Sequence, residues 1–227
     1  QKPWSLSEIE MLAKRCSVVY VLPRIATENE LPHWRQWISA LQKTAVTALC
    51  CGNLWAVQVA QEVGWTKELW GDFGLNIFNS WAGDVWQKKG LTGMMLSPEL
   101  NWVEIEALSG TWRKEALVHG NIPLMVSAHC PLGALVGGAA HKAACSRPCR
   151  HDARYFLRDE KGYSFPAISD IACRMHLFNP HQLCMIEDVP RFALNGIERL
   201  RLDLRFYQPE QVEQVVRLYR QALTWGI

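Results

Sequence analysis

The sequence predicts a mixed α/β protein with a (β/α) barrel-like fold, whole or partial, followed by a C-terminal β-hairpin and cysteine-rich region. Short β-rich runs alternate with amphipathic stretches through the first two-thirds of the 227 residues, at roughly 20 to 25 residues per unit. This alternation is typical of parallel strands joined by helical crossovers. Because no glycine-rich phosphate motif follows the first strand, a barrel is favoured over a dinucleotide-binding fold.

The elements follow from local patterns in chain order. Strands are expected where apolar and β-branched residues cluster, at 18–22, 45–49, 92–96, 115–118, 124–127 and 197–204. Helices are expected where apolar residues recur at helical spacing, at 31–41, 54–63, 80–89, 102–108 and 209–223. Ser80 is the expected N-cap of its helix, and Ser97-Pro98-Glu99 is an expected helix start. The runs 155–158 and 163–168, separated by 159–162, predict the hairpin.

Composition narrows the class of protein. Hydrophobic residues make up 49% and charged residues 20% of the chain, which indicates a globular and not a disordered protein. The sequence has no apolar run of the roughly 20 residues that a membrane span needs, and no secretory signal pattern. A net charge of +2 argues neither for nor against a nucleic-acid partner. Eight cysteines without an export signal favour the reducing cytoplasm, and therefore thiolates over disulfides.

The chain divides into three regions within one expected structural domain. Residues 1–127 carry the β/α barrel-type units, 128–185 a cysteine-rich segment with the hairpin, and 186–227 a closing strand and helix. The chain begins at Gln1 and not with Met, so we expect a fragment or the later part of a longer protein.

Four cysteines, Cys130, Cys145, Cys149 and Cys173, are the strongest functional signal. Their spacing of 14, 3 and 23 intervening residues fits neither a zinc ribbon nor a ferredoxin motif. The tight turn between Cys145 and Cys149 would supply two thiolates at little cost in loop entropy. From spacing alone, a metal ion or cluster and a set of buried reduced thiols remain open alternatives.

Other candidates lie where strands are expected to end, because a barrel builds its active site at the carboxyl ends of its strands. These candidates are Arg24, Asn53, Asp72, Asn76, Glu99, His119, Asn121 and His129. For each of them the alternative is a residue that caps a loop or turn. Arg174 and His176, beside Cys173, are candidates to contact cluster sulfurs or an anionic substrate, or to be plain surface residues.

Two other function classes have weaker signals. A protease needs a nucleophile, a base and an oxyanion site, and the sequence has neither G-x-S-x-G nor H-E-x-x-H. A non-catalytic RNA-binding or scaffold domain would need a basic stripe. A modest stripe lies beside the cysteines, formed by Arg147, Arg150, Arg154, Arg158 and Lys161, and a solvated polar face is its alternative.

Several phrases of the sequence, in order, resemble peptidase family U32. They are Gly71–Asn79, Leu96–Leu100, Leu124–Pro131, Tyr155–Gly162, and a tail with Phe165-Pro166, Asp170, Cys173-Arg174, Phe178-Asn179 and Leu200–Asp203. The similarity runs from about residue 18 to the end and resembles the C-terminal portion of the longer members. It implies a barrel-like β/α fold and a [4Fe-4S] cluster, which aerobic preparation can remove.

The resemblance also implies a function and a site. The favoured function is an iron-sulfur-dependent hydroxylase acting on RNA or a small aromatic or quinone precursor. A collagenase-like protease is the alternative, and a non-catalytic RNA-binding or scaffold domain is third. Cys130, Cys145 and Cys149 match the family's cysteine region; Cys173 is the expected fourth ligand and Cys184 its competitor. Further partners implied are the missing N-terminal region of the same protein and, through an uncovered apolar face, self-association.

Overall fold

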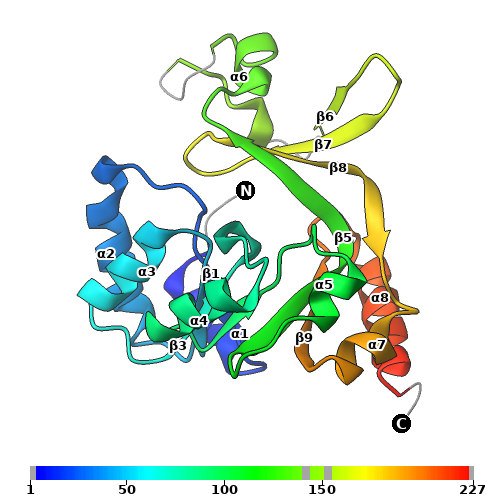
Figure 1. Ribbon diagram of the computed structural model, residues 1–227. Coiled ribbons are helices and arrows are strands. Elements are labelled where there is room, and N and C mark those ends of the chain that lie inside the picture. Colours follow the sequence, from blue (N-terminus) through cyan, green and yellow to red (C-terminus); the bar gives the residue numbers. More distant parts are fainter. Residues whose placement is uncertain (1–3, 140–143, 151–154, 225–227) are drawn as a thin grey trace. The chain divides into compact units, whose positions relative to one another are not determined.

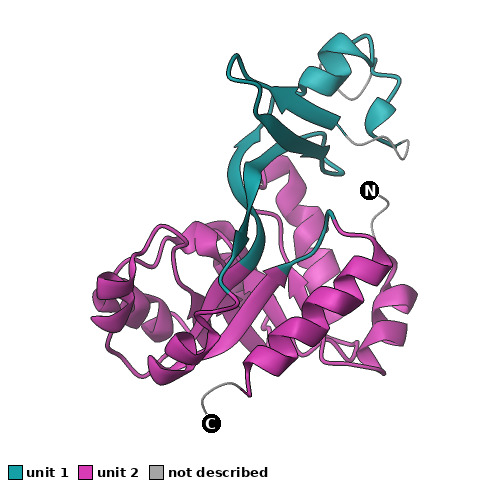
Figure 2. Ribbon diagram, turned by 90° about the vertical axis from the view of Figure 1, so that its right-hand side faces the viewer, with its two compact units in different colours: residues 1–3, 119–185, 203–206 teal, residues 4–118, 186–202, 207–227 magenta. Residues whose placement is uncertain are grey.

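The computed structural model describes residues 4–139, 144–150 and 155–224 and divides the chain into two compact units (Figure 2). Unit 1 contains 119–185 and 203–206, and unit 2 contains 4–118, 186–202 and the residues from 207 onward. The division falls within one long strand, β5 (Arg113–Ser127), whose first half belongs to unit 2 and whose second half belongs to unit 1. Each unit is described below by itself.

Unit 2 is built on a parallel sheet (Figure 1). Its strands are β1 (Val19–Val21), β2 (Ala48–Cys51), β3 (Glu68–Gly71), β4 (Gly93–Met95), the first half of β5, and β9 (Ile197–Asp203). The first five are adjacent in chain order, and each pairs in parallel with the next. Strand β9 pairs with β5. A mixed α/β fold is therefore confirmed, and this sheet is consistent with a barrel-like arrangement.

Helices connect the parallel strands β1 to β5, as parallel pairing requires, and further helices precede β1 and flank β9 in the chain. They are α1 (Leu6–Ala13), α2 (Leu31–Leu41), α3 (Leu54–Glu62), α4 (Ser80–Lys88), α5 (Trp102–Glu106), α7 (Val189–Leu194) and α8 (Pro209–Ala222), with 3₁₀ turns η1 (Glu28–Glu30) and η2 (Phe73–Leu75). Two predicted starts were wrong. The N-cap of α4 is Asn79, whose side chain accepts from Ala82 N at 2.9 Å, and not Ser80. Ser97-Pro98-Glu99 does not start a helix; α5 begins at Trp102, as the predicted helix at 102–108 does, after an Asn101 capping box.

The two faces of the parallel sheet differ in chemistry. Directly paired residues of parallel strands share a face, and alternate residues change face. One face carries Leu49, Leu69 and Met94, all buried. The other carries Ala48, Cys50 and Trp70, which form one buried cluster, and it continues into charged residues of β3, β5 and β9. Gly93 on β4 makes room for this cluster, because a Cβ there would lie 2.6 Å from the Trp70 ring.

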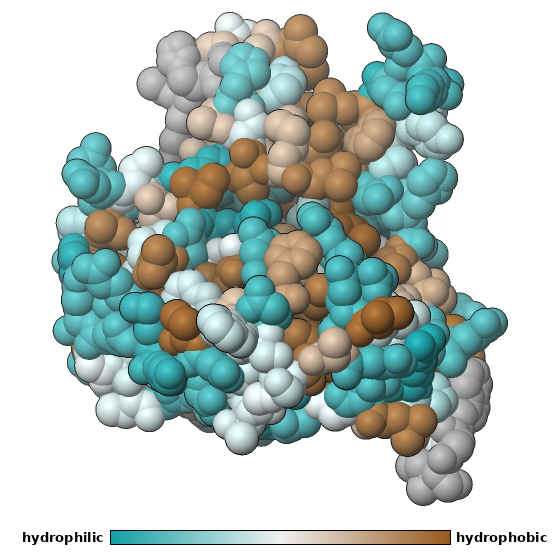
Figure 3. Space-filling model, in the orientation of Figure 1, coloured by the Kyte–Doolittle hydropathy of each residue, from teal (hydrophilic) through white to brown (hydrophobic). Residues whose placement is uncertain are grey.

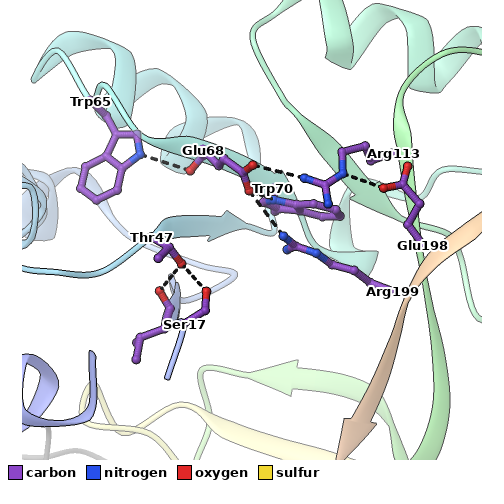
Figure 4. Close-up of polar contacts among 9 residues, drawn as sticks. Ser17, Thr47, Trp65, Glu68, Trp70, Arg113, Glu198 and Arg199 are labelled. Atoms are coloured by element: carbon purple, nitrogen blue, oxygen red, sulfur yellow. Dashed lines mark hydrogen bonds and ion pairs between the residues drawn. The ribbon is translucent and has the colours of Figure 1, made fainter. Parts of the chain in front are cut away.

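The charged face begins with a network around Trp70 (Figure 4). The Arg199 guanidinium lies 3.5 Å from the centre of the Trp70 ring and that of Arg113 lies 5.0 Å away. Glu68 accepts from the Trp70 indole at 2.9 Å and pairs with both arginines, while Glu198 pairs with Arg113 at 2.8 Å. Because Glu68 and Arg113 open their strands, this network lies at the amino ends, where barrel residues serve stability.

Unit 1 is an antiparallel sheet with a small helical lobe. Its strands are the second half of β5, β6 (Tyr155–Arg158), β7 (Ser164–Ser169) and β8 (Met175–Cys184), in the spatial order β5-β8-β7-β6. Helix α6 (Pro131–Leu135) and the 3₁₀ turn η3 (Pro148–Arg150) follow β5 along the chain. Figure 3 shows apolar side chains gathered over unit 1 on the face drawn, and its exposed apolar residues include Leu135 and Phe156.

One strand prediction needs correction. Residues 119–123 were expected to separate two strands, but β5 runs through them. Gly120 adopts φ +111°, and a Cβ there would lie 2.2 Å from the Asp203 carbonyl oxygen. The pairing of β5 with β8 shifts register on either side of Pro123. Glycine and proline therefore mark irregularities within a paired strand here and do not end it.

Candidate metal centre

Four cysteines line one hollow in unit 1. Cys130, Cys145, Cys149 and Cys173 lie around it, together with Ser169 and other residues of the same unit. None of these four described cysteines forms a disulfide; Cys130 is buried and the other three are half-buried. The four cysteines chosen from the sequence thus face a common space, although long stretches of chain separate most of them.

Cys130 is held at the start of a helix. It is the N-cap of α6, and its sulfur accepts from Gly133 N at 3.4 Å. The sulfur also lies 3.5 Å from Ser169 Oγ, which belongs to the last residue of β7. Pro131 occupies the first turn, where its fixed φ favours the helix. A thiolate at this position would be stabilised by both the amide and the hydroxyl.

Cys145 lies in a tightly constrained turn. Arg147 N donates to Cys145 Sγ at 3.3 Å, and Arg147 adopts the left-handed conformation, with φ +59°. Gly137 provides the space for the sulfur, because a Cβ on Gly137 would lie only 2.4 Å from Cys145 Sγ and 3.0 Å from Pro148 Cδ. A glycine without a side chain is therefore required at 137 for the thiol to reach the hollow as it does.

Of the two candidates for a fourth ligand, Cys173 lines the hollow and Cys184 is absent from its described lining. Cys173 lies in the turn between β7 and β8 and adopts φ +63°. Cys184 is exposed at the end of β8, where it pairs with His119 of β5. The geometry therefore favours Cys173 over Cys184.

Four cysteine thiols around one hollow are the residue type that binds an iron-sulfur cluster. Within the described residues, no three His, Cys, Asp or Glu side chains are grouped closely enough to hold one metal ion. Each thiolate of a [4Fe-4S] cluster binds a different iron, so its four sulfurs stand farther apart than the four ligands of a zinc ion. Four thiols line one hollow here, and the sulfurs of Cys130 and Cys145 accept backbone N–H groups, so these residues offer the ligand type and number that such a cluster needs.

The predicted residues Arg174 and His176 both contact Asp170 beside the hollow. The His176 ring lies 3.3 Å from Asp170 Oδ2, and the Arg174 guanidinium lies 4.0 Å from the same oxygen. Burial opposes the charged form of Asp170, but the His176 ring and the Arg174 amide outweigh it and lower its pKa. Arg174 and His176 therefore stabilise the charged carboxylate of Asp170, which lies shortly before Cys173 in the sequence.

Asp72, predicted as a substrate-binding residue, belongs to unit 2 and is buried in an ion-pair cluster. It follows β3, and its carboxylate lies 2.6 Å from the Arg201 guanidinium. Arg201 also pairs with Glu115 of β5 and donates to Cys50 Sγ of β2 at 3.4 Å. This cluster lies toward the carboxyl ends of the strands, where β/α barrels place their sites.

Sequence reasoning missed Arg201, Glu115 and Cys50. Burial raises the pKa of Glu115 despite the nearby Arg201. Burial, reinforced by Asp72, also raises the pKa of the Cys50 thiol, and that of Cys51 to about 12. Cys50 and Cys51 are therefore neutral thiols at pH 7, which makes them poor metal ligands. The alternation of charged and apolar residues along β9, from Arg199 to Asp203, was the available signal for Arg201.

The remaining predicted residues have other surroundings. In unit 2, Asn76 is an exposed residue that ends η2 with φ +50°, and exposed Glu99 donates its amide to Ser97 Oγ at 3.4 Å. In unit 1, His119 is buried in β5, where burial lowers its pKa, whereas His129 is exposed. None of these four is among the described residues that line the hollow.

Three further candidates are turn, cap or strand residues. The Arg24 guanidinium lies 4.8 Å from the Phe73 ring centre, and Asn53 is the N-cap of α3. Asn121 is buried within β5 and donates to the Asn179 carbonyl oxygen at 2.7 Å.

The basic stripe is partly described. Arg147 lines the hollow, and Arg150, Arg158 and Lys161 are exposed. Arg154 lies outside the described residues. No helix in the described part of the chain is long and apolar enough to cross a membrane.

The fold and the site together define a class: a barrel-like α/β protein that carries a four-cysteine hollow in a separate antiparallel unit. The chain belongs to peptidase family U32, whose family model matches residues 7–225.

The chain is similar to two Bacillus subtilis proteins and one from Porphyromonas gingivalis. It is 22% identical to tRNA hydroxylation protein P1 of Bacillus subtilis, over 95% of this chain and 51% of that protein. It is also 22% identical to tRNA hydroxylation protein P2 of the same organism, over 95% of this chain and 70% of that protein. It is 23% identical to a Porphyromonas gingivalis collagenase, over 86% of this chain and 49% of that protein. The chain thus spans about half the length of P1 and of the collagenase. No solved structure matches it.

Proposed function

We propose that this chain is the cluster-binding part of a U32 enzyme that hydroxylates RNA, with a [4Fe-4S] cluster held by Cys130, Cys145, Cys149 and Cys173. The observation that supports this proposal most is the convergence of these four thiols on one hollow. When bound, such a cluster supplies one-electron chemistry to the reaction.

The residues around the thiols have a definable role in this proposal. The amides of Gly133 and Arg147 donate to the sulfurs of Cys130 and Cys145, and hydrogen bonds to ligand sulfurs are a main determinant of cluster potential. The Ser169 hydroxyl lies where it can donate to Cys130 as well. Free thiolates of this kind persist in a reducing compartment, so we place the protein in the cytoplasm.

RNA is the favoured substrate for two reasons. The two Bacillus subtilis relatives are named tRNA hydroxylation proteins. In addition, Arg147 lines the hollow and the exposed Arg150 follows it closely in the chain, which suits contact with phosphate groups. A small aromatic or quinone precursor is the alternative substrate, and peptide hydrolysis is the alternative reaction because one relative is named collagenase.

A genetic experiment separates these functions. The complete gene is deleted and then restored as wild type, as Cys145→Ala or as Cys184→Ala, and the modified nucleosides and quinones of each strain are measured by mass spectrometry. We expect one hydroxylated nucleoside to disappear on deletion and to return with wild type and Cys184→Ala, but not with Cys145→Ala. Full restoration by Cys145→Ala would overturn the cluster role. Unchanged RNA with an altered quinone would transfer the proposal to the small aromatic substrate.

A further inference from the structure

The turn that carries Cys173 has an unusual backbone. It connects β7, which ends at Ser169, to β8, which begins at Met175. Cys173 N donates to the Asp170 carbonyl oxygen at 3.1 Å, and Asp170 N donates to the Arg174 carbonyl oxygen at 2.9 Å. Cys173 therefore falls at the left-handed position, with φ +63°, where a residue with a Cβ is strained.

The chain contains a second copy of this turn, between β6 and β7. Gly162 N donates to the Asp159 carbonyl oxygen at 3.1 Å, and Asp159 N donates to the Tyr163 carbonyl oxygen at 3.1 Å. The residue at the left-handed position of this copy is Gly162, with φ +87°. The same hydrogen-bonded turn thus uses glycine where no cysteine is needed, as backbone preference predicts. Cys173 occupies a glycine position, and the hollow that it lines supplies a reason for this departure.

Asp170 is the side chain that holds the cysteine turn together. Its Oδ1 accepts from Ala172 N at 2.9 Å and from Arg174 N at 2.8 Å, so it binds the amides on both sides of Cys173. Its other oxygen, Oδ2, faces His176 and the Arg174 guanidinium. In the glycine turn the equivalent Asp159 Oδ1 accepts from Tyr163 N at 2.9 Å. The cysteine turn has the additional bond to Ala172, next to the strained residue.

We propose that Asp170 is a positioning residue that holds Cys173 in the left-handed conformation and thereby presents its thiolate to the cysteine hollow. This inference rests on the proposed cluster role of the four cysteines. In this proposal Cys173 is held by Oδ1 of Asp170, which accepts from two backbone amides, and the contacts of Oδ2 are not needed. The carboxylate acts through Cys173 and is not itself a ligand.

Substitutions of Asp170 can separate the role of Oδ1 from that of Oδ2. Asp170→Asn keeps one carbonyl oxygen that can accept from both amides, and Asn is favoured in such turns, but it loses the charge beside His176. Asp170→Ala removes every acceptor. In anaerobically prepared protein we expect Asp170→Asn to retain wild-type iron. We expect Asp170→Ala to lose at least a quarter of its iron and, after mild oxidation, to give the electron paramagnetic resonance signal of a three-iron cluster.

Matched variants distinguish positioning from a general loss of structure. Asp159→Ala removes the same kind of turn contact from the same unit and should leave the iron content and the spectrum unchanged. Cys173→Gly should raise the melting temperature of the cluster-free protein by a few degrees while it lowers the iron content, because glycine suits the turn but offers no thiolate. If Asp170→Ala does not fold, Asp170→Glu replaces it, with the same expected spectrum.

The result that overturns the inference is a four-iron spectrum and full iron content in Asp170→Ala or its replacement, or equal losses in Asp170→Asn and Asp170→Ala. Either outcome would overturn only the role of Asp170 and would leave the cluster proposal standing. If the wild type itself binds no iron, the cluster proposal fails, and the inference is then judged on the cluster-free protein by the rate at which a thiol reagent modifies Cys173, followed by mass spectrometry. Asp170→Asn should keep the wild-type rate and Asp170→Ala should change it, and equal rates in the two would overturn the inference.

Discussion

Gly137→Ala tests the geometry of the hollow without changing any cysteine or charge. An added Cβ would lie 2.4 Å from Cys145 Sγ, and non-bonded heavy atoms normally approach to about 3.5–4.0 Å. The Gly133 carbonyl oxygen and Pro148 Cδ each lie 3.0 Å from the added Cβ, so they limit how far this Cβ can move away from the sulfur. The sulfur must therefore withdraw by about 1 Å, whereas metal–ligand distances tolerate only about 0.2 Å. Overpacking of this kind costs about 1–3 kcal/mol.

The assay is iron per chain in protein purified without oxygen, with the free energy of unfolding measured in parallel by urea. Gly138→Ala is the control, because its Cβ meets nothing within 4 Å but its φ of +81° strains an alanine by about 1–2 kcal/mol. We expect the two variants to lose similar stability, and only Gly137→Ala to lose iron. Wild-type iron content in a folded Gly137→Ala protein would refute the placement of Cys145 at the hollow.

Two further predictions concern the ion-pair cluster of unit 2. Arg201→Met leaves the carboxylates of Asp72 and Glu115 buried without their partner, so it should destabilise the protein by about 3–5 kcal/mol at pH 7. Arg35→Met, which breaks the exposed pair with Glu62, should cost far less stability in the same urea titration. The unfolding free energy of Arg201→Met should rise as the pH falls from 7 toward 4, because burial holds the folded-state pKa of Glu115 above its unfolded value, so the folded state binds more protons. A flat or falling profile would contradict the burial of the Glu115 carboxylate.

The sequence singled out the four cysteines that line the hollow, but it did not indicate how the fold brings them together. Cys145 and Cys149 are linked by a short turn, so their proximity follows from chain length alone. Cys130 and Cys173 reach the same hollow only because β8 pairs with both β5 and β7. The left-handed conformation of Cys173 could not be predicted, since cysteine gives no local signal for it.

Local patterns predicted helices well, but they did not predict features that depend on pairing between strands distant in the sequence. The helix at 31–41 was predicted with its observed bounds because its apolar residues recur at helical spacing. Asp72 was found as a residue that follows a strand, but Arg201 was not, because their contact depends on β9 pairing with β5. The continuity of β5 through Gly120 and Pro123 depends on its neighbour β8, which local turn preferences do not include.

The central claim is that four particular cysteines hold one cluster, and its most direct test is the iron and acid-labile sulfide content of anaerobically purified protein. Wild type should contain about four of each per chain, with visible charge-transfer absorbance. Single alanine substitutions of Cys130, Cys145, Cys149 and Cys173 should each lower the iron content, and Cys184→Ala should leave it at the wild-type value. Iron-free wild-type protein, or loss of iron on changing Cys184 but not Cys173, would contradict the account.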